Sequence, residues 1–172
     1  MKFPLTYGLQ MTNLPLIVTS GLLKNFCFLL DTGATHNVIF SFVYEHCKSK
    51  FRVLEGQQKI MGIEGQNKEC LIVETTFIFE GIEYTPIFLV LDATEAISQV
   101  QKETEVQIHG ILGADAFLNG VVKIDYDQKK IQFIKSEYFN GKQKKYTKIP
   151  INISKSKPYI NVESKISDTN TV

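Results

Sequence analysis

One aspartate of this 172-residue chain directly follows an apolar run, at a position where its carboxylate could do chemistry. The run is Phe26–Leu30, and Asp31, Thr32 and Gly33 come after it. A buried strand fixes the position of the residue at its end, and a glycine permits the tight turn that must follow. Asp31 could therefore act as a general acid or base, or it could be a turn residue that hydrogen-bonds its own loop.

A second element further along the chain combines apolar residues, glycines and a predicted helix start. It spans Ile108–Leu118 and reads I-H-G-I-L-G-A-D-A-F-L. Together with the D-T-G-A of Asp31–Ala34, it resembles the paired motifs of the retropepsin-like aspartic proteases, in which I-L-G enters a helix. The G-A-D-x-F-L wording, followed by V-V-K-I-D-Y, is most similar to the bacterial branch of that family, and the resemblance extends over about Leu14–Phe133.

The resemblance implies roles for individual residues of both motifs. Asp31 matches the catalytic aspartate, Thr32 the threonine whose hydroxyl bonds the other subunit's loop, and Gly33 the glycine whose carbonyl faces substrate. The residues that would line the cleft next to them are Ala34, Thr35 and His36. Retroviral members have charged residues at the positions of Thr35 and Ala114, so their charge pairing cannot form here and the substrate register stays open.

A segment in the middle of the chain matches the family's flap, a hairpin that closes over bound peptide. It spans Ile60–Gln66, where two glycines flank an apolar tip, as suits a mobile lid. The residues of this segment that would contact substrate are Met61, Gly62, Ile63, Glu64 and Gly65.

Hydrolysis of this kind needs two carboxylates that share one proton, but the chain has one D-T-G. Asp92 and Asp168 are not followed by the glycine, and Asp115 opens a helix, where carboxylates commonly bond first-turn N–H groups. A homodimer with a two-fold axis would supply the second Asp31. The single motif thus predicts a homodimer, and the family resemblance implies that its subunits meet through active-site loops and terminal strands.

Short apolar and β-branched segments predict an all-β fold with one or two short helices. The family resemblance implies that this fold is a retropepsin-like closed barrel or sandwich. Glu80-Gly81 and residues 126–129 are predicted hairpin turns. Predicted helices are Phe42–Cys47, with Ser41 as N-cap, and Ala114–Leu118, while Asp92–Gln107 is a long connection that is partly helical. The predicted strands are Leu14–Thr19, Phe26–Leu30, Val38–Phe40, Phe51–Leu54, Cys70–Phe79, Ile82–Leu91, Val121–Asp125 and Lys130–Ile134.

The chain length fits one main domain with a short extension. We assign residues 1–135 to the protease-like domain and residues 136–172 to a C-terminal extension with a frayed end. The extension has two weaker strand candidates, Lys148–Ile153 and Tyr159–Val162, which could pair with a second copy or with the edge of their own domain.

Composition excludes several other classes of function. Nineteen Lys and Arg balance eighteen Asp and Glu, which predicts neither nucleic acid nor a membrane as partner, and Lys142–Lys148 is interpreted as a solvated turn. No apolar run approaches the ~20 residues that span a bilayer, and the N-terminus has no signal-peptide pattern, so we expect a cytoplasmic protein. Three cysteines and three histidines share no metal-binding spacing, so neither a metal nor another cofactor is expected.

These observations favour an aspartic endopeptidase with water activated by an Asp31 pair. The family resemblance implies that its substrates are extended, largely apolar peptide segments. Two alternatives stay open. The chain could be a non-catalytic peptide-binding module on the same fold, or a self-processing domain that cleaves only its own flanks.

Overall fold

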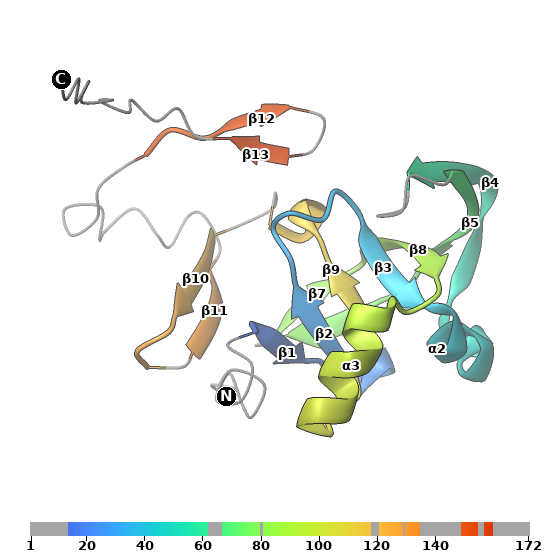
Figure 1. Cartoon of the computed structure of the whole chain (residues 1–172), viewed down its shortest axis with the longest axis horizontal. Coiled ribbons are helices and arrows are strands. Elements are labelled where there is room, and N and C mark those ends of the chain that lie inside the picture. The colour runs from blue at the N-terminus through green and yellow to red at the C-terminus, as the bar shows by residue number, and fades with distance from the viewer. Residues whose placement is uncertain are drawn as a thin grey trace, which may run out of the picture.

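The structure is a computed structural model that describes residues 14–61, 67–79, 81–117, 121–128, 130–134, 149–154 and 157–159. Its main element is a seven-stranded mixed sheet with strand order β1-β2-β9-β3-β8-β5-β4 (Figure 1). The strands of this sheet are β1 Leu16–Val18, β2 Cys27–Leu30, β3 Asn37–Phe40, β4 Arg52–Met61, β5 Asn67–Glu74, β8 Ile87–Leu91 and β9 Gly110–Leu112.

The centre of the sheet brings the two sequence motifs together. Strand β9 lies between β2, to which it runs parallel, and β3, to which it runs antiparallel. Leu30, the last residue of β2, pairs with Leu112, the last residue of β9. The residues that follow these two strands therefore emerge side by side at one edge of the sheet.

Three two-stranded hairpins complete the described strands. They are β6 Phe77–Phe79 with β7 Ile82–Tyr84, β10 Val121–Asp125 with β11 Lys130–Ile134, and β12 Asn152–Ser154 with β13 Lys157–Tyr159. Gly81 has a φ of 78°, which glycine adopts readily, and this confirms the predicted turn between β6 and β7. The hairpin predicted around residues 126–129 is confirmed by the pairing of β10 with β11.

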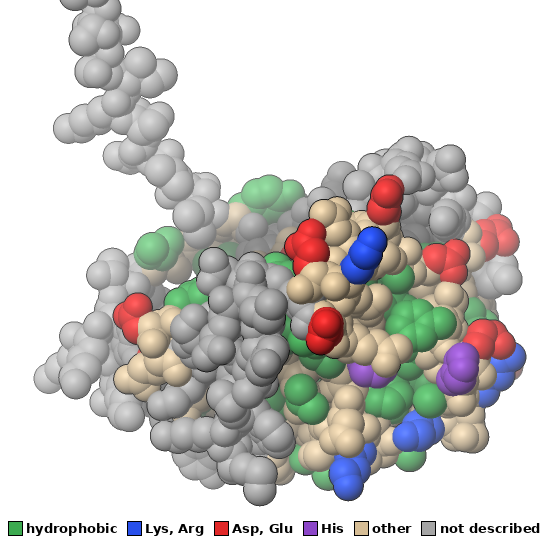
Figure 2. All heavy atoms as spheres, turned by 60° about the horizontal axis from the view of Figure 1, so that its bottom comes forward, with side chains coloured by type: hydrophobic (Ala, Val, Ile, Leu, Met, Phe, Trp, Pro, Cys, Tyr) green, Lys and Arg blue, Asp and Glu red, His purple; other side chains and the backbone are tan. Residues whose placement is uncertain are grey.

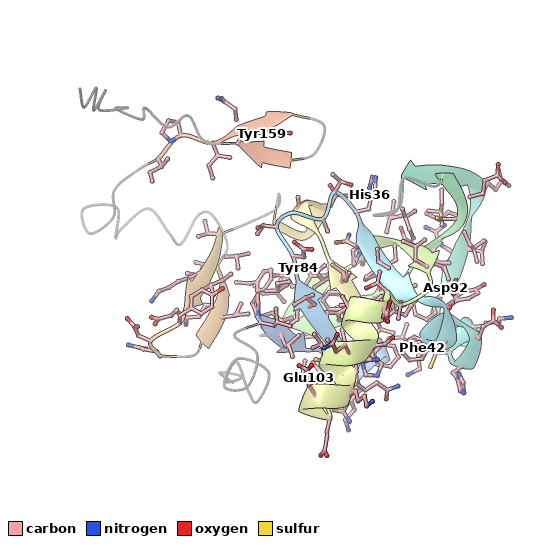
Figure 3. All side chains as sticks on the ribbon, in the orientation of Figure 1. His36, Phe42, Tyr84, Asp92, Glu103 and Tyr159 are labelled. Carbon is pink, nitrogen blue, oxygen red and sulfur yellow. The ribbon has the colours of Figure 1, made fainter. Side chains whose placement is uncertain are left out.

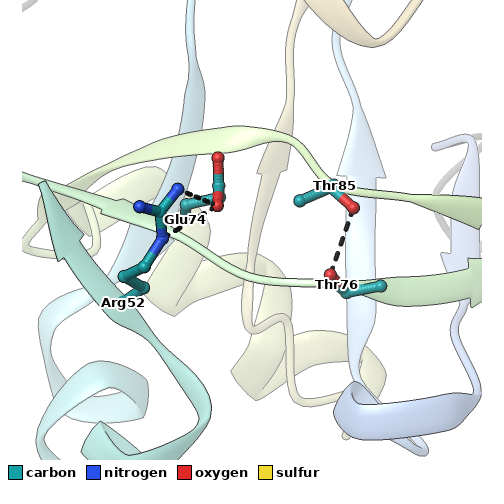
Figure 4. Close-up of polar contacts among 4 residues, drawn as sticks. All are labelled: Arg52, Glu74, Thr76 and Thr85. Carbon is teal, nitrogen blue, oxygen red and sulfur yellow. Dashed lines mark hydrogen bonds and ion pairs between the residues drawn. The ribbon is translucent and has the colours of Figure 1, made fainter.

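Two predicted long strands are each broken into two, which corrects the sequence prediction. Cys70–Phe79 divides between β5 and β6, and Ile82–Leu91 divides between β7 and β8. Between β7 and β8, Pro86 has no N–H to donate to a strand ladder. Between β5 and β6, the Thr75 hydroxyl donates to the Lys50 carbonyl at 2.7 Å. The hydroxyls of Thr76 and Thr85 hydrogen-bond across the two breaks at 3.1 Å, and the ion pair between Arg52 and Glu74 lies nearby (Figure 4).

Two α-helices and three 3-10 turns lie among the described residues. The part-helical prediction for Asp92–Gln107 is confirmed, because Thr94 accepts a hydrogen bond from the Ile97 N–H and caps α3. The prediction that Ser41 caps the other helix is wrong: Ser41 is its first residue, and its hydroxyl donates to Asp92 at 2.6 Å. The helical segments are η1 Gly21–Leu23, α2 Ser41–His46, η2 Lys48–Lys50, α3 Glu95–Thr104 and η3 Ala114–Phe117.

Aromatic side chains form much of the core between the sheet and the hairpins. Phe28 of β2 is fully buried, and its ring stacks on Phe77 and Phe88, each at 5.7 Å between centroids. Phe133 of β11 meets Phe79 and Tyr84 edge-on, at 5.0 and 5.6 Å, and so joins the β10–β11 hairpin to the core. The all-β fold with short helices is confirmed.

The strands of the C-terminal extension form a hairpin of their own, while pairing with a second copy stays a prediction. β12 and β13 pair with each other, in the register Asn152 to Tyr159, and not with the described strands of the main sheet (Figure 1). Tyr159 is half exposed, and Ile149 and Ile151 just before β12 are each 58% exposed. The division of the chain at residue 135 stays a prediction.

Charged side chains of both signs are scattered over the face shown in Figure 2, among polar and apolar ones. This distribution agrees with the near-neutral net charge of +1. In the parts of the chain that the structure describes, no helix is both long and apolar enough to cross a membrane.

Candidate active site

Asp31 begins a tight loop that is attached to the neighbouring strand. Its N–H donates to the Leu112 carbonyl at 2.9 Å, directly after the last pair of the β2–β9 ladder. The Ala34 N–H donates back to the Asp31 carbonyl at 3.1 Å and closes the turn. Thr32 and Gly33 at its tip are exposed, whereas Asp31 is half-buried. The main chain of Asp31 is thus fixed by the sheet while the loop faces outward.

The Asp31 carboxylate also bonds its own loop. Its Oδ1 accepts a hydrogen bond from the Gly33 N–H at 2.8 Å. A turn residue would make this contact, so the bond agrees with the simpler alternative raised by the sequence. It is equally compatible with catalysis, because a carboxylate has about four acceptor sites and one N–H occupies only one of them.

The I-L-G segment contacts the far side of the same loop. The Ala114 N–H donates to the Ala34 carbonyl at 2.8 Å. A Cβ added to Gly113 would lie 2.6 Å from the His36 carbonyl oxygen and 2.7 Å from that of Ala34, so the two segments approach each other too closely for any other residue. The chain thus needs glycine at this point in order to hold the Asp31 loop against β9.

Gly110, the first residue of β9, has a similar role three residues before Gly113. A Cβ on Gly110 would overlap the carbonyl oxygen of Val38 in β3 and would press on the Phe28 ring. The spacing G-I-L-G therefore follows from two close approaches of β9 to its neighbours.

His36 lies at the end of the loop, where β3 begins (Figure 3). Its Nδ1 is 4.0 Å from Oδ2 of Asp115, and both side chains are more than a third exposed, at 35% and 43%. The sequence places His36 in the cleft and Asp115 at the start of a helix, and Asp115 does lie in the first turn of η3. The sequence did not predict the contact between these two side chains, because they lie on segments far apart in the chain.

Sequence reasoning also missed two further residues that hold the site. Asn37 is a buried polar residue whose side chain bonds Gly113. His109 accepts a hydrogen bond at Nδ1 from the Cys27 N–H, at 3.0 Å, and its ring stacks on Phe26 with centroids 4.7 Å apart. Burial lowers the pKa of His109. No local pattern identifies either residue, because both act on strands distant in sequence.

The strands on either side of the predicted flap pair in antiparallel fashion, and their last pair is Met61 with Asn67. Residues 62–66 lie outside the described part of the chain. The substrate contacts predicted for Met61, Gly62, Ile63, Glu64 and Gly65 therefore stay predictions.

Two other kinds of reactive group, a metal site and the Cys27 thiol, can be compared with the Asp31 loop among the described residues. No group of three His, Cys, Asp or Glu side chains is placed to hold a metal ion among them. Burial raises the pKa of the Cys27 thiol to about 11, so it is protonated at neutral pH and is a poor nucleophile. The Asp31 loop is the best-supported candidate site.

Comparison with known proteins agrees with this geometry. The family model described as aspartyl protease matches residues 10–116, a span that includes Asp31, Gly113 and the strands that carry them. This chain belongs to the aspartyl protease family. Within that family match lie β1 to β9 and most of η3, whereas β10 to β13 follow it.

Three solved structures are also similar to this aspartyl protease family member. EIAV protease complexed with the inhibitor HBY-793 is 24% identical, with 62% of this chain and 86% of that chain covered and a TM-score of 0.46. The retroviral protease-like domain of Ddi1 from Leishmania major is 14% identical over 70% and 94%, with a TM-score of 0.45. A retropepsin-like aspartic protease from Rickettsia conorii is 14% identical over 70% and 83%, with a TM-score of 0.47. No curated protein sequence matches this chain.

Proposed function

We propose that this protein is an aspartic endopeptidase in which Asp31 is the catalytic residue. The observation that supports this most directly is the attachment of the Asp31 loop to the residues on either side of Gly113. Asp31 bonds Leu112 on one side, and Ala34 bonds Ala114 on the other. A carboxylate on a main chain that is fixed in this way, at the ends of two neighbouring strands, suits a group that must meet a substrate in a fixed geometry.

The active unit in this proposal is a homodimer with two-fold symmetry. One ionised Asp31 takes a proton from water while the protonated Asp31 of the other copy donates to the scissile carbonyl oxygen. Thr32 bonds the loop of the second copy, and the exposed position of Thr32 and Gly33 allows that approach. Because two nearby carboxylates share one proton, activity is highest at mildly acid pH and falls as both become ionised.

The substrate in this proposal is an extended, largely apolar peptide segment. The Gly33 carbonyl, Ala34, Thr35 and His36 form one wall of the cleft, and the segment between β4 and β5 covers the peptide and excludes water. An extended peptide can bond the cleft through its main chain, as an added strand does, while its side chains fill pockets. We infer no metal or other cofactor for this reaction.

We further propose that residues 136–172 form a separate extension that takes part in the dimer interface. The exposed side chains of Ile149, Ile151 and Tyr159 support this, because they would be covered in an isologous contact. A cytoplasmic location remains part of the same proposal.

The experiment that tests the function is cleavage of a denatured-protein mixture between about pH 4 and 7, with wild type beside Asp31→Asn. The side-chain oxygen of the variant can still accept the Gly33 N–H, but neither copy of the variant carries a carboxylate at position 31. Cleavage by wild type that disappears in the variant supports the proposal. Peptide binding without cleavage by either protein, in samples confirmed to be dimeric, indicates the binding module, whereas cleavage only within the protein's own chain indicates a self-processing domain. Equal cleavage by both proteins refutes the assignment of Asp31.

A further inference from the structure

Asn37 is a buried amide at the point where three strands of the main sheet meet. It is the first residue of β3, and its exposed fraction is 3%. Strand β8 runs parallel to β3 on one side, and β9 runs antiparallel on the other. A buried polar side chain costs stability unless it is hydrogen-bonded, so its partners indicate what it does.

Both ends of the Asn37 amide are used. Its Oδ1 accepts a hydrogen bond from the Gly113 N–H at 3.0 Å, and its Nδ2 donates to the Ile87 carbonyl at 3.0 Å. The opposite amide orientation would set the NH2 group against an N–H and the oxygen against a carbonyl. The partners therefore fix which way the amide points.

Gly113 is the midpoint of the segment to which the Asp31 loop is bonded. The residue before it, Leu112, accepts from the Asp31 N–H, and the residue after it, Ala114, donates to Ala34. Since Gly113 directs its own N–H to Asn37, one buried side chain holds the middle of the segment whose two ends hold the loop. The main chain of residues 112–114 and hydrogen bonds of 2.8 to 3.1 Å make up the link from Asn37 to Asp31.

We propose that Asn37 is a positioning residue for Asp31: it anchors Gly113 to β8 and so fixes the loop on which the catalytic carboxylate sits. This inference rests on the proposed function of Asp31. Its consequence is chemical as well as structural, because a misplacement of about 1 Å at a reacting group can lower a rate by about 10²-fold.

Two variants of Asn37 separate positioning from simple stability. Asn37→Leu has the same branching but removes both hydrogen bonds. Asn37→Asp keeps an oxygen that accepts from Gly113 and, in the mildly acid assay, a protonated carboxyl that can also donate to Ile87. The control is Thr75→Val, which removes the buried hydrogen bond to the Lys50 carbonyl at the β4 end of the sheet.

The readouts are kcat, KM, the free energy of unfolding, and hydrogen exchange of the Gly113 and Ala114 amides. We expect Asn37→Leu to lower kcat by about 10²-fold with little change in KM, and to speed exchange at both amides. Asn37→Asp should recover most of kcat in mildly acid buffer and lose it again, relative to wild type, as the pH rises. Thr75→Val should lose stability while its kcat and its exchange at both amides stay as in wild type.

Several results would overturn the inference. Asn37→Leu could keep the wild-type kcat or unchanged exchange, or Thr75→Val could lose as much kcat as Asn37→Leu. If Asn37→Leu does not fold, Asn37→Asp decides alone, and a kcat ratio to wild type that is independent of pH contradicts the inference. Exchange can be measured without any activity, so a wild type that does not cleave refutes the proposed function while the exchange data still test whether Asn37 holds the loop.

Discussion

Gly113→Ala tests the close contact between β9 and the Asp31 loop. The added Cβ would lie 2.6 Å from the His36 carbonyl oxygen and 2.7 Å from that of Ala34. Both obstacles belong to the main chain, so no side chain can rotate away. The closer contact reaches 3.4 Å only if the two segments separate by about 0.8 Å. A shift of that size would lengthen the bond from Ala114 to Ala34, now 2.8 Å, beyond hydrogen-bonding range.

The expected magnitude follows from these changes. Overpacking costs about 1–3 kcal/mol and the lost hydrogen bond about 0.5–1.5 kcal/mol, while replacing glycine by alanine recovers about 0.4–1 kcal/mol from the unfolded chain. The free energy of unfolding should therefore fall by about 0.5–4 kcal/mol. The effect on cleavage should be larger, because the loop that moves bears Asp31, and we expect kcat to fall by about 10²-fold.

Urea unfolding and peptide-cleavage kinetics measure the two effects on the same samples. Gly81→Ala is the matched control, since its φ of 78° strains an alanine by about 1–2 kcal/mol although nothing lies within 4 Å of the added Cβ. It should lose stability and keep the wild-type kcat. If Gly113→Ala retains both stability and kcat, or if the two variants lose kcat equally, the account of this contact is wrong.

Two further predictions concern the strand that leads to Asp31. His109 accepts the Cys27 N–H at Nδ1, which a protonated imidazole cannot do, and burial lowers its pKa. The unfolded chain therefore binds this proton more readily than the folded one, so the stabilisation is complete above a pH of about 6.5 and is lost as the pH falls below it. Urea unfolding at pH 5 and pH 7 should show a weaker pH dependence in His109→Asn, whose side chain can accept the same bond, and an equal dependence would contradict this. Because burial raises the pKa of Cys27 to about 11, iodoacetamide at pH 8 should modify the half-buried Cys47 well before Cys27, and mass spectrometry that finds equal rates would refute it.

The sequence was most informative where a local pattern determines the structure. The apolar run before Asp31 predicted a strand that ends at the candidate site, and Glu80-Gly81 predicted a hairpin that β6 and β7 form. The pair of motifs also predicted that Asp31 and the I-L-G segment lie together. These features depend on neighbouring residues, so local sequence is sufficient to identify them.

Features that depend on distant partners were missed. Ser41 looks like a helix cap, but its hydroxyl bonds Asp92, which no local pattern reveals. The apolar residues on both sides of Thr75 favour a strand equally. The structure shows that the chain leaves the main sheet there for the β6–β7 hairpin, and that Thr75 bonds the distant Lys50. Asn37 and His109 similarly have roles that appear only once β9 lies between β2 and β3.

The central claim is that one active site needs an Asp31 from each of two chains, and subunit mixing tests it most directly. Wild type and Asp31→Asn are unfolded together in equal amounts and refolded. The activity of the mixture is compared with that of wild type alone at the same total protein concentration. If both carboxylates are required, random pairing leaves about a quarter of the wild-type activity, because only pairs of two wild-type chains are competent. A residual activity of about half would mean that each chain acts alone, and it would contradict the account.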